Sequence, residues 1–68
     1  MSESPMELIR KLDQAAAALL ELARQVRASA PEVPDAELRQ EMLDSAEAME
    51  RRAREMAEAI AGLRVKIN

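Results

Sequence analysis

Apolar residues recur along this chain at alternating intervals of three and four, the spacing that gathers side chains on one face of an α-helix. Over residues 5–30 the first position of a seven-residue repeat, position a, is mostly alanine: Ile9, Ala16, Ala23 and Ala30. Position d holds larger residues: Leu12, Leu19 and Val26. The pattern runs without a slip and predicts one long amphipathic helix.

The second half of the chain repeats this arrangement. Position a holds Ala46, Ala53 and Ile60, and position d holds Met42, Met49, Met56 and Leu63. Both halves therefore place small residues at a and large residues at d. Alternating sizes let two helices approach closely while their layers stay filled. The sequence favours helix-on-helix packing.

Prolines and capping residues set the boundaries. Ser4 followed by Pro5 is typical of a helix start, and Asp35 can cap a second helix. Pro31 and Pro34 must end the first helix, because proline lacks an amide donor and clashes with the preceding turn. We predict an all-α fold, a single antiparallel two-helix hairpin. Its parts are a helix over about 5–30, a proline turn at 31–35, a helix over about 36–62 and a short tail at 63–68.

The tail admits two interpretations. In the favoured interpretation the helical spacing continues from Ile60 through Leu63 to Ile67, although Gly62 could cap the helix, so the helix frays between Ala61 and Lys66. Leu63, Val65 and Ile67 also alternate as in a β-strand, which could add to the sheet edge of a partner.

The apolar stripe is wider than one hairpin can cover. Leucines at positions flanking a and d widen it, among them Leu8, Leu20, Leu22, Leu38 and Leu43. A chain of 68 residues without cysteine also lacks the disulfides that small domains often need. We therefore expect a homodimer that forms a four-helix bundle, or a complex with another helical protein. The predicted interface comprises Leu8, Leu12, Leu19, Leu22, Val26, Leu38, Met42, Leu43, Met49, Met56, Ile60 and Leu63.

Met42, Met49 and Met56 are expected to fill the core of this bundle, because methionine adapts to irregular gaps. An exposed methionine groove for a partner helix is a second interpretation. A copper(I) site is disfavoured, because residues seven apart on a helix lie about 10.5 Å apart along its axis.

The chain carries a net charge of −3, so nonspecific attraction to nucleic acid or anionic lipid is not favoured. One basic cluster, Arg51, Arg52 and Arg54, is interpreted as a solvated face in which Arg51 and Arg54 form ion pairs with glutamates four residues away. Its alternative role is a nucleic-acid patch, with Arg24 and Arg27 as possible additions.

The residue inventory argues against catalysis and bound cofactors. There is no histidine, no cysteine and a single glycine, so the serines lack a base and no phosphate loop can form. We expect no enzyme activity, no cofactor, no metal, no small-molecule substrate and no membrane span. A cytoplasmic location is the default expectation.

In outline the chain is similar to two groups of helical hairpins. The small-at-a, large-at-d layering resembles the plasmid copy-number repressor family, dimeric hairpins that bind RNA loops, although this chain lacks their aromatic residue. The proline turn and apolar C-terminal end resemble needle subunits and co-chaperones of type III secretion, without the long polar N-terminal arm of the subunits. The function expected from the residues is a non-enzymatic protein–protein interaction module: a small adaptor, co-chaperone or regulatory subunit. An RNA- or DNA-binding regulator is the alternative.

Overall fold

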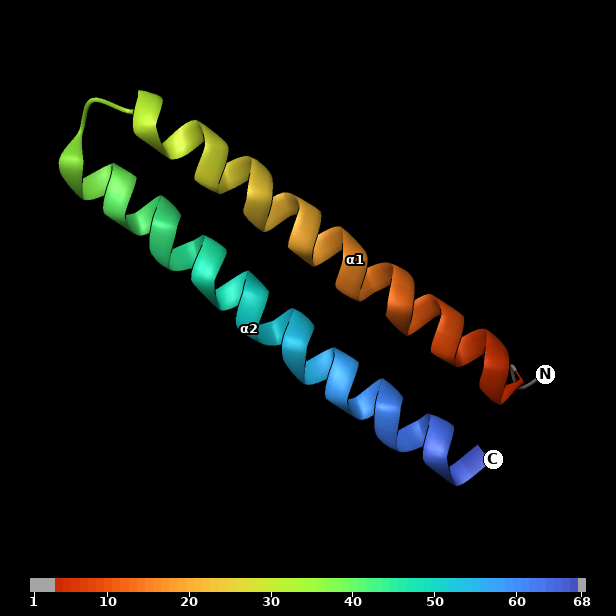
Figure 1. Cartoon of the computed structure of the whole chain (residues 1–68). Helices are drawn as coiled ribbons and strands as arrows, with labels where there is room; N and C mark the ends of the chain where they lie inside the picture. The colour runs from red at the N-terminus through yellow and green to blue at the C-terminus, as the bar shows by residue number, and fades with distance from the viewer. Residues whose placement is uncertain (1–3, 68) are drawn as a thin grey trace.

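Two antiparallel helices lie side by side along almost their whole length (Figure 1). The structure, a computed structural model, describes residues 4–67. Helix α1 spans Pro5–Ser29, a 3-10 turn η1 spans Ala30–Glu32, and helix α2 spans Ala36–Ile67. The rod measures 49 × 20 × 16 Å. The predicted all-α hairpin is confirmed.

Each helix begins at the capping residue that the sequence indicates. The Ser4 hydroxyl accepts the backbone N–H of Glu7 at 3.2 Å, and Pro5 occupies the first helical turn. The Asp35 carboxylate accepts two backbone N–H groups, from Glu37 at 2.9 Å and Leu38 at 3.3 Å. These contacts satisfy amide donors that a helix start leaves without intrahelical partners.

The turn is closed by Arg39, a role that the sequence did not reveal. Arg39 occupies an a position where the rest of α2 has alanine or isoleucine, and its side chain is half-buried. Its guanidinium donates to the carbonyl oxygen of Val33 at 2.8 Å. The turn between the helices is therefore stabilised by a side chain of α2 as well as by the two prolines.

Helix α2 is longer than predicted. The sequence interpretation ended it near residue 62 and left 63–68 as a tail, but the helix continues through Gly62 to Ile67. Gly62 does not adopt the positive φ of a helix-capping glycine. The strand-like alternation of Leu63, Val65 and Ile67 is overridden by the helical spacing from Ile60. Asn68 lies outside the described residues.

The buried core of the hairpin consists of the a positions. These side chains are at most 8% exposed, and all but two are alanine: Ile9, Ala16, Ala23, Ala30, Ala46, Ala53 and Ile60. Alanine at the line of contact lets the helix axes approach, since interaxial distance depends on the side chains between them. The two isoleucines close the end of the seam near the chain termini. This narrow core leaves the larger d residues to one side.

Candidate interaction face

The a positions form the centre of the seam, and its two sides differ in chemistry. On one side, the e positions of both helices meet through ion pairs. The d positions lie on the other side and are only partly covered. Because the e positions share one side, the g positions of both helices flank the d positions on the opposite side. We call these two sides the ion-paired flank (e) and the open face (d and g).

The strongest contact on the ion-paired flank joins Arg27 of α1 to Glu50 of α2. Nε of Arg27 donates to Glu50 Oε2 at 2.9 Å, and Nη2 donates to Oε1 at 2.6 Å. This two-pronged geometry matches the planar guanidinium to the carboxylate. The hydrogen bonds from Arg27 hold the pKa of Glu50 below its ordinary value, and the same pairing raises the pKa of Arg27.

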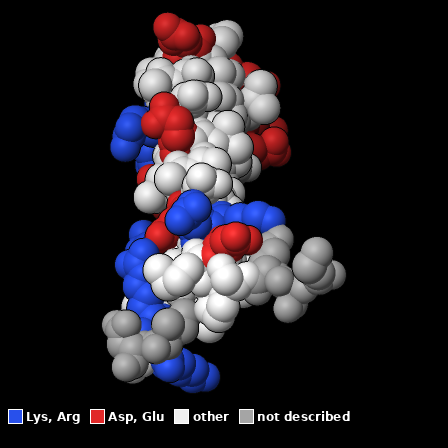
Figure 2. Space-filling model, turned by 90° about the vertical axis from the view of Figure 1, so that its right-hand side faces the viewer, with Lys and Arg blue, Asp and Glu red and all other residues white. Residues whose placement is uncertain are grey.

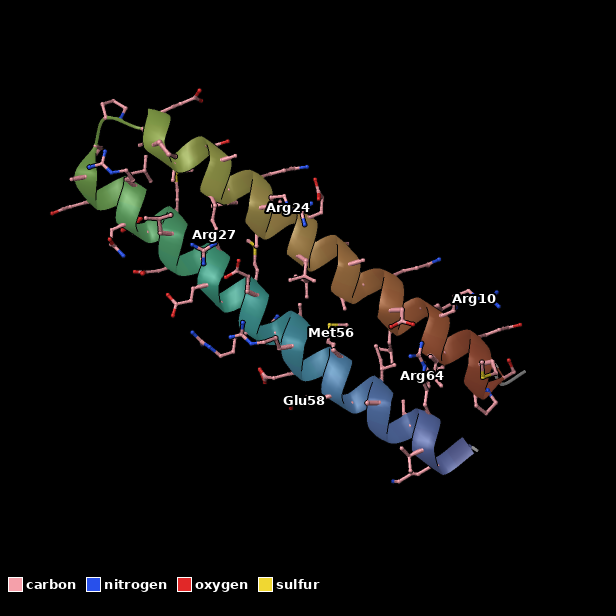
Figure 3. The ribbon with its side chains drawn as sticks, viewed as in Figure 1. Arg10, Arg24, Arg27, Met56, Glu58 and Arg64 are labelled. Carbon is pink, nitrogen blue, oxygen red and sulfur yellow. The ribbon has the colours of Figure 1, made fainter. Side chains whose placement is uncertain are left out.

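A second ion pair lies near the chain ends. Nη2 of Arg64 donates to Asp13 Oδ2 at 2.8 Å. Arg27 and Arg64 both reach across between the helices, whereas Glu58 points away from α1 (Figure 3). The two pairs connect residues far apart in sequence, so together they fix the register of the hairpin. Leu20 and Leu43 occupy e positions on this same flank.

The open face carries ten large apolar side chains on two adjacent helices. Its d residues are half-buried, and its three g leucines are 45–48% exposed. Serine and charged side chains are sparse on it: Ser29, Ser45, Arg52 and Lys66 share its g positions. The ten residues are Leu8, Leu12, Leu19, Leu22, Val26, Leu38, Met42, Met49, Met56 and Leu63. A contiguous apolar surface of this kind is typical of a protein–protein interaction site.

Ten of the twelve residues predicted for the interface thus lie on the open face. Ile60 does not, because it is 2% exposed within the hairpin's own core. Leu43 is half-buried on the ion-paired flank. The heptad pattern alone could not separate the two sides, because d, e and g all border the a positions.

The methionines are neither buried in the hairpin nor freely exposed. Met42, Met49 and Met56 are half-buried at d positions. Within the single hairpin the fully buried side chains are mostly alanine. The expected place of the methionines in the core of a four-helix bundle stays a prediction. The exposed part of each methionine side chain contributes to the open face.

The arginine cluster does not form one surface. Arg51, Arg52 and Arg54 are all exposed, and none forms an ion pair with a residue in the described range, in contrast to the expected pairs with nearby glutamates. Arg52 lies at a g position on the open face, whereas Arg51 and Arg54 lie on the outer side of α2. Arg24 and Arg27, the possible additions, pair with Glu21 and Glu50 respectively.

Within residues 4–67, no group of three or more carboxylates is arranged to hold a metal ion. Neither helix, as far as it is described, contains a stretch long and apolar enough to cross a membrane.

The residues that close the ion-paired flank were not identified from the sequence. Asp13, Arg27, Glu50 and Arg64 all occupy e positions, and opposite charges meet there once the antiparallel register is known. That signal was present in the repeat, since e positions face each other in an antiparallel pair. It becomes visible only when the two helices are aligned on their a positions.

Comparison with known proteins identifies no family for this chain. No family model matches it, and no curated protein or solved structure is significantly similar to it. The functional argument therefore depends on the two sides of the seam.

Proposed function

We propose that the hairpin is a non-enzymatic protein–protein interaction module that self-associates through its open face into a four-helix bundle. In this role it acts as a small adaptor, co-chaperone or regulatory subunit. The observation that supports the proposal is the open face itself: ten large apolar side chains, half-buried or exposed, on one side of a seam whose other side is closed by ion pairs.

Energetics favour covering this face. Burying a leucine side chain completely is worth about 1.5–3 kcal/mol, so a leucine that is 45–48% exposed has about 1 kcal/mol still to gain. Association costs roughly 4–15 kcal/mol in lost freedom. In a symmetric dimer each side chain is buried once in each copy. The total free energy gained by burial is therefore doubled and can exceed the cost of association.

Leu22 and Leu20 provide a matched test of the proposal. Both are 45% exposed and only two residues apart, but Leu22 lies on the open face and Leu20 on the ion-paired flank. We expect Leu22→Glu to weaken self-association by roughly 100-fold, because each copy would bury a carboxylate in the interface. Leu20→Glu should leave association nearly unchanged. Sedimentation equilibrium of both variants and the parent measures the dissociation constants.

The outcomes separate the competing explanations. Equal weakening by both substitutions would contradict the assignment of the open face. A monodisperse, cooperatively melting monomer at high micromolar concentration would contradict self-association. Poor helicity in the isolated chain, restored by a co-expressed helical partner, would favour an obligate heteromeric subunit instead.

The alternative function, an RNA- or DNA-binding regulator, has one observation in its favour. Arg51, Arg52 and Arg54 are exposed and make no ion pair with a described residue. However, Arg52 lies on the open face, so a dimer formed there would separate it from the other two. Acidic neighbours such as Glu47 and Glu55 also oppose phosphate binding.

Fluorescence anisotropy with a labelled RNA hairpin at low salt tests this alternative. Binding that is lost in the variant with all three arginines changed to alanine would support it. No binding by the parent protein would exclude it. Circular dichroism must show that this variant is as helical as the parent protein, so that a loss of binding does not come from unfolding.

A further inference from the structure

Methionine is the only residue type in this chain that mild oxidants modify readily. The sequence contains five methionines and has no cysteine, histidine, tryptophan or tyrosine. A methionine thioether takes up one oxygen atom to become a sulfoxide, and an apolar side chain thereby becomes polar. The effect of a mild oxidant on this protein therefore depends on where five side chains lie.

Three of the five methionines form a row on the open face. Met42, Met49 and Met56 occupy consecutive d positions of α2, about 10.5 Å apart along the helix. The d positions of α1 hold leucine and valine instead. Figure 3 shows Met56 on the side of α2 that is nearer to α1. The thioethers of the open face are thus concentrated on one helix, and we call these three residues the methionine row.

The methionine row is accessible only while the open face is uncovered. Its side chains are half-buried in the single hairpin, so part of each one contacts solvent. Hydrogen peroxide is small and uncharged, so the charges of both signs that Figure 2 shows on one side of the rod neither attract nor repel it. A second copy seated on the open face would shield the thioethers. Oxidation and association therefore compete for the same surface.

The rest of the hairpin gives oxidation little else to disturb. The buried seam consists of alanine and isoleucine, which peroxide does not modify. Met6 is 58% exposed at an e position, on the other side of the seam from the open face. A sulfoxide of the methionine row can stay hydrated in the single hairpin, but in a bundle it would be pressed against hydrocarbon. Burying a polar group without a hydrogen-bond partner is costly.

We propose that the methionine row is a peroxide-responsive modification site that controls self-association through the open face. The proposal rests on the proposed function and adds its regulation. In each oxidation the sulfur attacks one peroxide oxygen, the O–O bond breaks, and the other oxygen leaves as water. The sulfur loses two electrons and the peroxide gains them. The sulfoxide form stays a single hairpin.

Reduction reverses the modification. Methionine sulfoxide reductases remove the oxygen as water while two thiols become a disulfide, and the thioether is regenerated. The row then returns to its apolar form and the open face regains its capacity to associate. Reversal separates this control from irreversible damage to the chain.

The competition between oxidation and association can be measured at each methionine. The parent protein is exposed to a large excess of hydrogen peroxide over a series of protein concentrations, and peptide mass spectrometry gives the oxidation rate at each site. At ten times the dissociation constant, mass action leaves about one fifth of the chains free, so rates at Met42, Met49 and Met56 should fall about fivefold. The rate at Met6 should stay constant and serves as the internal reference.

Sedimentation equilibrium before and after peroxide treatment tests the control itself. Oxidation should weaken self-association of the parent about 100-fold or more, because each copy would bury three sulfoxides. Treatment with methionine sulfoxide reductases and dithiothreitol should restore it. In the variant with Met42, Met49 and Met56 all changed to leucine, the dissociation constant should be the same before and after peroxide, although Met6 is still oxidised.

A pair of substitutions separates the open face from unfolding. Glutamine is polar, is close to methionine in length and is a good helix former, so it imitates a sulfoxide without peroxide. Met49→Gln should weaken association about tenfold, whereas Met6→Gln should leave it unchanged. Circular dichroism of both variants checks that they are as helical as the parent.

The outcomes distinguish this proposal from self-association itself. A parent protein that associates equally well with its methionine row oxidised would overturn the control and leave self-association intact. Loss of association on oxidation in the leucine variant would assign the effect to other methionines and would also overturn it. A parent protein that remains a monomer at every concentration would overturn both proposals.

Discussion

The two sides of the hairpin seam come from the same seven-residue repeat, but one is closed by ion pairs and the other carries partly exposed apolar side chains. On the ion-paired flank, Arg27 and Glu50 satisfy each other within one chain, as do Asp13 and Arg64. On the open face, the large apolar side chains of both helices stay half-buried or exposed within the single hairpin. The comparison shows that exposure alone does not separate the two sides, because Leu20 and Leu22 are equally exposed on them. What distinguishes them is the chemistry of their neighbours.

The line between the two sides is the alanine seam, and disturbing it should have the largest effect on stability. Ala23 is fully buried, so Ala23→Leu inserts three carbons where the helices touch. We expect a loss of about 1–3 kcal/mol in the free energy of unfolding. Urea denaturation followed by circular dichroism, at fixed protein concentration, measures it. Ala28→Leu, at an exposed position of the same helix, is the control. Equal stability of the two variants would mean that the helices do not meet at position a.

The seam also shows how far the sequence could predict this structure. The seven-residue repeat, Pro31 and Asp35 were sufficient for the hairpin and its turn, because they act through local backbone geometry. The repeat did not determine which positions lie at the centre of the helix–helix contact. A contact centred between positions a and d is consistent with the same spacing of apolar residues. Only the packed helices show that alanine alone occupies most of the centre and that methionine lies to one side.

The ion-paired flank and the end of α2 were missed for related reasons. Arg27 appeared in the sequence as a possible member of a basic patch, and its partner, 23 residues away, is defined only by tertiary register. Gly62 is a common helix-ending residue, but continued apolar spacing from Ile60 to Leu63 outweighed its local preference. For Arg27 a long-range contact decided what the local pattern left open, and for Gly62 the helical spacing outweighed the local preference of glycine.

The open face should tolerate a change of shape that preserves volume. Met49 is half-buried there, so Met49→Leu is expected to cost less than about 1.5 kcal/mol in stability and to leave the dissociation constant nearly unchanged. Denaturation and sedimentation equilibrium test the two parts separately. If stability were retained while association was lost, the thioether itself would be needed for partner contact, and simple apolar burial would no longer explain the face.

A smaller effect is expected at Gly62, which belongs to neither side. A Cβ built at this position meets no atom within 4 Å, and the residue is exposed within a continuous helix. Gly62→Ala should therefore raise stability by about 0.5–1 kcal/mol through helix propensity alone, without altering association. Thermal unfolding at matched concentration measures the gain. A loss of stability would show that the helix ends before Gly62.

The smallest effect belongs to the ion-paired flank, and its signature is pH dependence. Hydrogen bonds from Arg27 hold the pKa of Glu50 below its ordinary value, so the folded chain releases this proton more readily than the unfolded chain. The resulting stability is present above the ordinary glutamate pKa, about 4.3, and is lost as the pH falls through the lower folded value. Glu50→Gln should therefore melt at a lower temperature than the parent at neutral pH, with the two curves converging in acid.

Glu58→Gln is the matched control for this pH experiment. It removes the same charge from α2, but its side chain points away from α1 (Figure 3). The difference between the Glu50→Gln and parent curves should exceed the corresponding difference for Glu58→Gln at neutral pH. A gap between parent and Glu50→Gln that widened in acid would have the wrong sign for a carboxylate with a lowered pKa. The contact with Arg27 would then fix the register of the helices without stabilising the charged form of Glu50.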